Sequence, residues 1–394
     1  MSSTATSEFP KGLGKVSRGS IGLAVLGLIV AGGGAAALGD LPERGLHLYF
    51  YGWLIAMGFS LGSYGLMLLH YVVKGSWGYP VIRLWEAGAR LLPGLFVLGI
   101  PLFLLREKLY PWAQPHITDP MVLHRSAYLN ASAVAVRALV YFFIWIGSTY
   151  YLTSLSRKQD ELKDPTLIQA RTNFSAIGMV IFVLTVNFAY TDWVMSLEAH
   201  WYSTIFGVWF VISQALCAVA IATIFTYFVR AEEPYLNAVD NGVRKDFGNL
   251  LLMLTMVWAY FSFSQWVIIW SGNLPDEIEF YLHRFSGHWL TIGAFLVVFQ
   301  FFAPFVALLS GKTKRIPTLL LTVASWLLLM RFLDIAWHVF PSLNNSRPLD
   351  VVPAIGTALF VLGVWLVFTI RGMKSALVIP VWVDPIMEEA VNHA

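Results

Sequence analysis

Ten long apolar segments, separated by short polar turns, constrain the fold of this 394-residue sequence more than any other feature. A bilayer core about 30 Å thick requires roughly 20 apolar residues in a helix, which satisfies all of its own backbone hydrogen bonds. Only 12% of the residues are charged, whereas about 25% is usual in soluble domains. The sequence therefore predicts an all-α integral membrane protein with about ten transmembrane helices. The predicted spans are residues 19–39, 46–73, 79–105, 127–155, 172–195, 201–229, 247–271, 285–310, 316–340 and 354–371.

Lys and Arg near helix ends mark the cytoplasmic side of a membrane protein. Sixteen of them lie in the N-terminus, the even-numbered connections and the C-terminal tail. The odd-numbered connections hold six, namely Arg44, Arg106, Lys108, Arg125, Arg284 and Arg347. Both termini are therefore expected in the cytoplasm, with residues 1–18 and 372–394 as cytoplasmic segments. The basic N-terminus and the apolar run after it also fit a cleavable signal peptide, which would leave the rest of the topology unchanged.

A weak internal repeat relates the two halves of the chain. The tripeptide Leu-His-Arg precedes the fourth span at 123–125 and the eighth span at 282–284. In the next span of each half, a basic residue opens the helix and an Asp lies near its end, Asp192 in one and Asp334 in the other. We expect two four-helix bundles in parallel repeat, residues 46–195 and 201–340, with flanking helices 19–39 and 354–371. Because each copy has an even number of helices, the two copies share one orientation.

A few ionisable residues fall inside the predicted spans, where charge is costly and is by default a sign of function. They form two sets with helical spacing, and both sets are candidates for a proton path. Glu86 and Arg90 are four residues apart and able to pair, and Arg137 is expected at a similar depth. Arg331, Asp334 and His338 form the second set, in the outer half of the membrane. The alternative is that both sets are structural ion pairs.

The segment 192–201 joins the fifth and sixth spans on the predicted outer side and combines carboxylates, a histidine and tryptophans. Such groups could frame a polar head group at the interface, so Asp192, Glu198, His200 and Trp201 are candidates for quinone contact. Interfacial anchoring alone would also explain the tryptophans.

The sequence predicts no metal site and no covalently bound cofactor. Its one cysteine, Cys217, excludes a Cys-ligated cluster and a c-type haem motif. His70 lies near the predicted inner face, whereas the other membrane histidines lie toward the outside. This arrangement disfavours a subunit with two haems, but a single haem near the outer face remains an alternative. No P-loop, dinucleotide fingerprint or zinc spacing occurs. The basic residues are spread over short loops, so nucleic acid is not an expected partner.

The segments DWVMSLEAHWYSTIF (192–206) and IIWSGNLPDEIEFYLHR (268–284) carry a resemblance. They are similar to loops of the ActF-type, NrfD-like membrane subunits of alternative complex III, a bacterial quinol:cytochrome c oxidoreductase. The resemblance extends over most of the chain in length, spans and paired bundles. Asp192 matches the Asp of the quinol pocket in the related ActC-type subunit. The His that accompanies it there, about two turns earlier, has no counterpart in residues 171–192.

The resemblance implies a multi-pass subunit of the bacterial cytoplasmic membrane that contributes scaffold, possible quinone or menaquinone contact and a possible proton path. Haem c and iron-sulfur clusters are then expected in partner subunits only. The implied partners are multihaem and monohaem cytochromes c, an iron-sulfur protein, a paralogous NrfD-like subunit, small membrane subunits and lipid. Two other functions fit the same pattern of spans and charges: a secondary transporter with parallel repeats and a purely structural anchor.

Overall fold

The fold is all-helical in the part of the chain that the computed structural model describes, residues 11–39, 41–343, 346–374 and 377–380. Among these residues, ten helical segments are long and apolar enough to cross a bilayer, which confirms the predicted class and number of spans. The remainder of the expected terminal segments, residues 1–10, 375–376 and 381–394, lies outside the described residues.

Eight of the ten segments are single long helices, several of them longer than predicted. They are α1 (Lys11–Leu38), α2 (Leu41–Val73), α6 (Ala131–Leu162), α7 (Pro165–Trp193), α8 (Phe206–Val229), α10 (Asn241–Gly272), α15 (Pro317–Val339) and α16 (Val351–Met373). The ends follow from local chemistry. Asn130, Asp164 and Asp240 cap α6, α7 and α10 by accepting backbone N–H bonds. Lys163 and Asn273 end α6 and α10 in the left-handed conformation.

The third and eighth spans are interrupted, which the sequence pattern did not predict. The third consists of α3 (Ile82–Ala89) and α4 (Leu92–Leu104), and Pro93 lies just after the break. The eighth consists of α12 (Gly287–Leu296), a π-helical turn (Val297–Phe302) and α13 (Ala303–Leu309), with Pro304 at its start. Proline has no N–H and its ring clashes with the carbonyl four residues earlier, so Pro93 and Pro304 suit the first turn of a new helical segment and disturb the turn before it.

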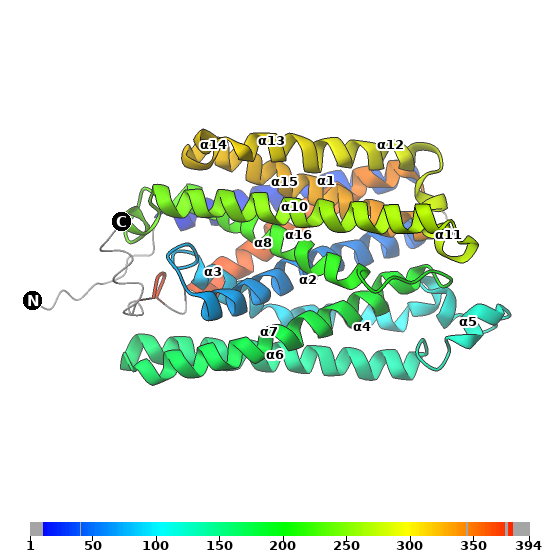
Figure 1. The fold of residues 1–394 in the computed structure, drawn as a ribbon, viewed down its shortest axis with the longest axis horizontal. Coiled ribbons are helices and arrows are strands. Elements are labelled where there is room, and N and C mark those ends of the chain that lie inside the picture. Colours follow the sequence, from blue (N-terminus) through cyan, green and yellow to red (C-terminus); the bar gives the residue numbers. More distant parts are fainter. Residues whose placement is uncertain (1–10, 40, 344–345, 375–376, 381–394) are drawn as a thin grey trace, which may run out of the picture.

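Short helices and 3₁₀ turns form the connections at the two ends of the bundle. The helices are α5 (Pro120–His124), α9 (Tyr235–Ala238), α11 (Pro275–Arg284) and α14 (Gly311–Arg315), and the turns are Arg106–Lys108, Pro111–Ala113, Met195–Leu197, Phe340–Ser342 and Pro348–Asp350. In Figure 1, α5 and α11 lie at one end of the long helices and α14 at the other. We call these the α11 end and the α14 end.

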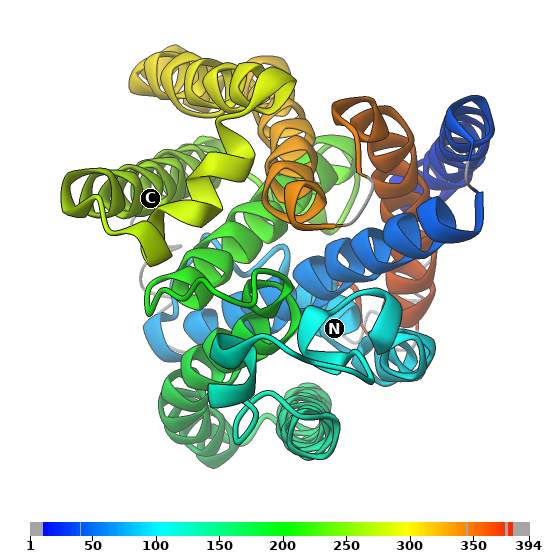
Figure 2. The ribbon, with the colours of Figure 1, turned by 90° about the vertical axis from the view of Figure 1, so that its right-hand side faces the viewer.

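The helices pack around two central members, α2 and α8. Of the most apolar window in each span, 94% is buried for α2 and 72% for α8, against 11% for α1. Viewed along the bundle in Figure 2, α6 and α7 lie on one side, α12 and α13 on another, and α1 with α16 at the edge. Gly62 permits the crossing of α2 and α8, because a Cβ there would lie 2.3 Å from the Gln214 carbonyl oxygen. Helices in lipid associate closely through such small residues.

The edge pair of α1 and α16 is also joined by glycines. A Cβ on Gly27 would lie 2.2 Å from the Phe360 backbone nitrogen, and one on Gly356 would lie 2.5 Å from the Ala31 nitrogen. Gly32, on the same helix as Gly27, has open space around its Cβ position. The two helices therefore touch backbone to backbone along one face only.

We predict that Gly27→Leu destabilises the purified protein, because overpacking a close contact costs about 1–3 kcal/mol. The midpoint of thermal unfolding in mild detergent should fall by several degrees. Gly32→Leu is the matched control and should leave the midpoint nearly unchanged. Equal midpoints for the two variants would contradict the backbone contact between α1 and α16.

Candidate functional site

A cavity of about 240 Å³ lies near the α11 end, between α2, α4, α6 and α7. Its walls are mostly apolar and aromatic, and Asp192 and Arg106 are the charged residues among them. The lining also includes Phe50, Trp53, Phe96, Gly99, Ile100, Leu102, Phe103, Tyr110, Trp112, Val134, Ala135, Ala138, Leu139, Phe142 and Trp193. Ile100 and Leu139 are 43% and 56% exposed, so the wall between α4 and α6 borders the lipid-facing surface.

Asp192 lies in the last turn of α7 and is buried. Arg137 of α6 makes a bidentate ion pair with it, because Nη2 and Nε lie 2.9 Å from the two carboxylate oxygens. Tyr141, one turn further along α6, donates to the same carboxylate at 3.1 Å. Bidentate pairs of this kind are among the strongest hydrogen-bonded contacts in proteins. The pair places a carboxylate in the wall of a mostly apolar cavity.

The connection after α4 lies against the cavity and is tied to the segment after α7. The Tyr110 hydroxyl donates to the Trp193 carbonyl at 3.0 Å, and the Trp112 indole donates to Ser196 at 3.1 Å. Further along the same connection, Arg125 donates to the carbonyls of residues 199, 200 and 201. Loop 105–130 is thus fixed to loop 194–205 at several points.

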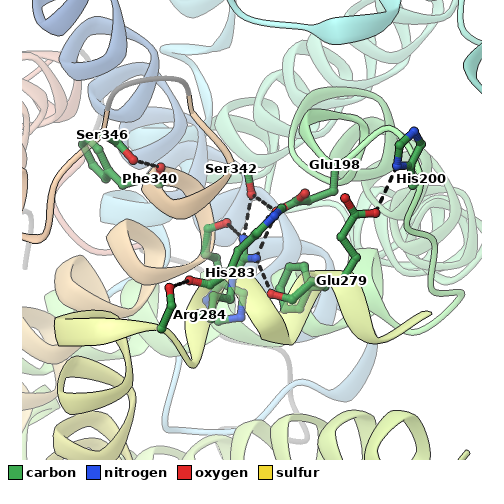
Figure 3. Close-up of polar contacts among 11 residues, drawn as sticks. Glu198, His200, Glu279, His283, Arg284, Phe340, Ser342 and Ser346 are labelled. Atoms are coloured by element: carbon green, nitrogen blue, oxygen red, sulfur yellow. Dashed lines mark hydrogen bonds and ion pairs between the residues drawn. The ribbon is translucent and has the colours of Figure 1, made fainter. Parts of the chain in front are cut away.

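Glu198 joins the two halves of the molecule at the α11 end (Figure 3). Its carboxylate accepts from Arg284 of α11 at 3.2 Å and from Ser342 at 2.7 Å, and His283 lies 3.1 Å away. Burial alone would raise the pKa of Glu198, but Arg284 and the hydrogen-bond donors hold it below its usual value. Burial lowers the pKa of Arg284 to about 10, so the guanidinium remains charged at neutral pH.

His200 bridges two carboxylates from distant parts of the chain. Its Nε2 lies 2.5 Å from Asp119, the N-cap of α5, and its Nδ1 lies 3.1 Å from Glu279 of α11. Figure 3 shows the contact with Glu279. Only the doubly protonated imidazolium donates from both nitrogens. The hydrogen bond to Asp119 and the charge of Glu279 raise the pKa of His200.

Of the four residues expected to frame one head group, Asp192 alone lines this cavity. Asp192 lines the cavity, whereas Glu198 and His200 join loops through protein contacts. Trp201 is buried, and its ring stacks on Phe280 with centroids 4.2 Å apart. Sequence proximity placed these residues together, but the chain turns sharply after α7 and separates them.

Glu86 is the centre of a buried polar cluster in α3. It pairs with Arg83 at 2.7 Å and accepts hydrogen bonds from Tyr71 at 2.5 Å and Ser156 at 2.6 Å. Arg83 in turn contacts Asp160 of α6. The spacing of Glu86 and Arg90 suggested an ion pair between them, but Glu86 pairs with Arg83 instead.

Arg90 and Arg137 do not share a depth, contrary to the expectation from span lengths. The Arg90 Nε donates to Thr153 of α6 at 3.0 Å, and its guanidinium lies over the Tyr150 ring. Thr153 is 16 positions beyond Arg137 on the same helix, about 24 Å along its axis at 1.5 Å per residue. The error arose because α6 continues past the predicted end of the span, to Leu162.

The second predicted charge set is brought together on α15. Asp334 contacts Arg331, accepts from the Trp258 indole at 3.3 Å, and lies 3.5 Å from the His338 Nδ1. The His338 ring packs against Trp209, with centroids 3.8 Å apart. This Asp334 cluster (Trp258, Arg331, Asp334 and His338) lies on α10 and α15, whereas the Glu86 cluster lies on α2, α3 and α6.

Several residues at these sites were not among the sequence candidates: Asp119, Glu279, Arg106 and the cavity aromatics. The described residues hold no group of three or more His, Cys, Asp or Glu side chains able to bind a metal ion. No family model matches this sequence, and no curated protein is significantly similar to it.

We predict that the His200 bridge makes stability depend on pH. Its pKa is raised in the folded protein, so its contribution is fully present below about 6.5, the ordinary value, and is lost as the pH rises through the folded value. In detergent, the thermal midpoint should therefore fall from pH 6 upward more steeply in the wild type than in His200→Gln.

The exposed His124 lies on the same α11 end, so His124→Gln is the matched control and should keep the wild-type slope. The bridge is about one-third exposed, and solvent screening keeps such contributions small. Parallel curves for wild type and His200→Gln would show that the bridge contributes nothing.

Proposed function

We propose that this chain is a membrane subunit of a quinol:electron-acceptor oxidoreductase complex of the alternative complex III type, and that its cavity holds a quinone head group. The observation that carries the proposal is the aromatic cavity with Asp192, paired to Arg137, in its wall. Ligand pockets for rings are mostly apolar with a few placed polar groups. At about 240 Å³, the cavity is below the roughly 300–1,000 Å³ of drug-sized pockets, which suits a head group whose tail lies outside.

Access from the bilayer supports this occupant. Ile100 and Leu139 belong both to the cavity wall and to the exposed apolar surface between α4 and α6. A prenylated quinone is dissolved in the lipid phase, so an entrance between two lipid-facing helices suits it better than it suits a water-soluble substrate. Asp192 would accept a hydrogen bond from a hydroxyl of the quinol.

The proposed site is in the bacterial cytoplasmic membrane, with the α11 end outside and both termini inside. The described ends of the chain support this orientation, because α1 begins and α16 ends at the α14 end (Figure 1). The basic residues support it too, because the connections at the α14 end hold most of the Lys and Arg. The cavity would then lie near the outer face.

We further propose that α2–α7 and α8–α15 are parallel copies of one four-helix unit. Corresponding short helices, α5 and α11, both start with Pro and carry Leu-His-Arg at their ends. The arginines have similar roles: Arg125 donates to carbonyls just after α7, and Arg284 donates to the His338 carbonyl in α15. In this arrangement Asp192 and Asp334 occupy equivalent helices.

Quinol oxidation releases two protons and two electrons. We propose that the electrons pass to haem c and iron-sulfur centres of partner subunits, as the resemblance implies, and that this chain supplies scaffold and quinone contact. The Glu86 and Asp334 clusters are the proposed proton-handling groups. Each combines a buried carboxylate with Tyr, Ser or His partners that can exchange protons.

The helix interruptions favour this function over a transporter. In transporters built from repeats, broken helices occur at corresponding places in the two copies. Here the third and eighth spans are interrupted, but in the proposed repeat the third span corresponds to the seventh. The seventh is the continuous helix α10.

We predict that filling the cavity abolishes quinone binding. Ala138 lines it, so Ala138→Phe should remove binding of a short-tailed menaquinone analogue, measured by quenching of tryptophan fluorescence. Asp192→Asn should weaken binding at least tenfold, because it removes the charged acceptor.

Val136→Phe is the matched control, since Val136 is 60% exposed on the same helix and should retain affinity. Thermal midpoints identify any variant that fails to fold. Undiminished binding in a folded Ala138→Phe protein would place the quinone outside this cavity.

A further inference from the structure

The cavity contains a second polar group whose hydrogen-bonding capacity is incompletely used. Arg106 follows the end of α4 and lines the cavity. Its Nη1 donates to the Phe103 carbonyl at 3.2 Å, and Nη2 lies 3.8 Å from Glu107, beyond hydrogen-bond distance. Its Nε is buried and has no hydrogen-bond partner among the described residues. A buried donor left unpaired is costly and calls for an explanation.

Three other donors in the wall already have acceptors within the protein. The Trp53 indole donates to the Leu95 carbonyl, the Trp112 indole to Ser196 and the Tyr110 hydroxyl to the Trp193 carbonyl. The rings of these side chains line the cavity, but their N–H or O–H groups already donate hydrogen bonds to other protein atoms. Arg106 is different, because part of its guanidinium remains available to an oxygen atom of an occupant.

The two charged groups of the cavity are complementary in hydrogen bonding. Asp192 is an acceptor held by Arg137 and Tyr141, and Arg106 is a donor contributed by a different segment of the chain. A ring that carries two oxygens at opposite positions can donate from one hydroxyl to the carboxylate and accept from the guanidinium at the other. A ring with a single oxygen satisfies only one of the two.

We infer that Arg106 binds the second oxygen of the ring and thereby makes the cavity selective for rings that carry two oxygens over rings that carry one. This inference rests on the proposed quinone site and names the residue that sets its specificity. The loose contact with Glu107 and the Phe103 carbonyl holds the guanidinium at the cavity in the absence of a ligand. Phe103 supports it further, because the guanidinium carbon lies 5.0 Å from the centre of that ring.

The test compares two probes that differ by one oxygen, a short-tailed naphthoquinol and the matching 1-naphthol. Binding to the purified full chain is followed by tryptophan quenching. The wild type should prefer the naphthoquinol by about tenfold, equivalent to about 1.4 kcal/mol. Arg106→Gln should lose that preference by weakening the naphthoquinol alone, and Arg106→Lys should keep part of it.

Lys108→Gln is the matched control, because Lys108 lies in the same 3₁₀ turn but is exposed and absent from the cavity wall; it should keep the full preference. If Arg106→Gln weakens both probes equally, or neither, the inference is wrong while the quinone site stands. If the wild type binds neither probe, the proposed function fails as well. Loss of bound phosphatidylglycerol in Arg106→Gln with unchanged probe binding would assign Arg106 to a lipid head group and overturn the inference.

Discussion

The ion pair between Asp192 and Arg137 is the interaction on which the cavity depends. A carboxylate within an apolar bundle stays ionised only if a partner compensates for lost hydration, and Arg137 does so with two hydrogen bonds. The pair fixes α6 against α7 at the α11 end. On α6, Val134 and Ala138 are four residues apart and share the helix face that lines the cavity. One contact thus supplies both the charge and a wall of the proposed site.

Loop contacts at the α11 end keep this arrangement in place. The segment after α7 is bound on one side by Arg125 and Trp112 from the first half of the chain. On the other side it is bound by Arg284 through Glu198. The connection after α4, which lines the cavity through Arg106, Tyr110 and Trp112, therefore belongs to a network that includes both halves. A change in α11 would therefore affect the cavity indirectly, through Glu198, and not through a direct contact.

The transmembrane spans could be predicted from the sequence because hydropathy and length are properties of single segments. The sequence also placed Arg331, Asp334 and His338 together, since residues on one helix at these spacings share a face. It could not identify the partners of Asp192 or His200, which lie 55 and about 80 positions away. The sequence could not predict the cavity for the same reason. Its walls come from four helices, and no local sequence pattern encodes how those helices pack.

The central claim is that this chain works within a quinol-oxidising membrane complex. The most direct measurement is to purify the tagged chain from its native membrane in mild detergent, identify the co-purifying proteins by mass spectrometry, and assay quinol:cytochrome c reduction. We expect haem c and iron-sulfur subunits to co-purify with the activity. A chain that purifies alone, without haem and without quinol oxidation, would contradict it.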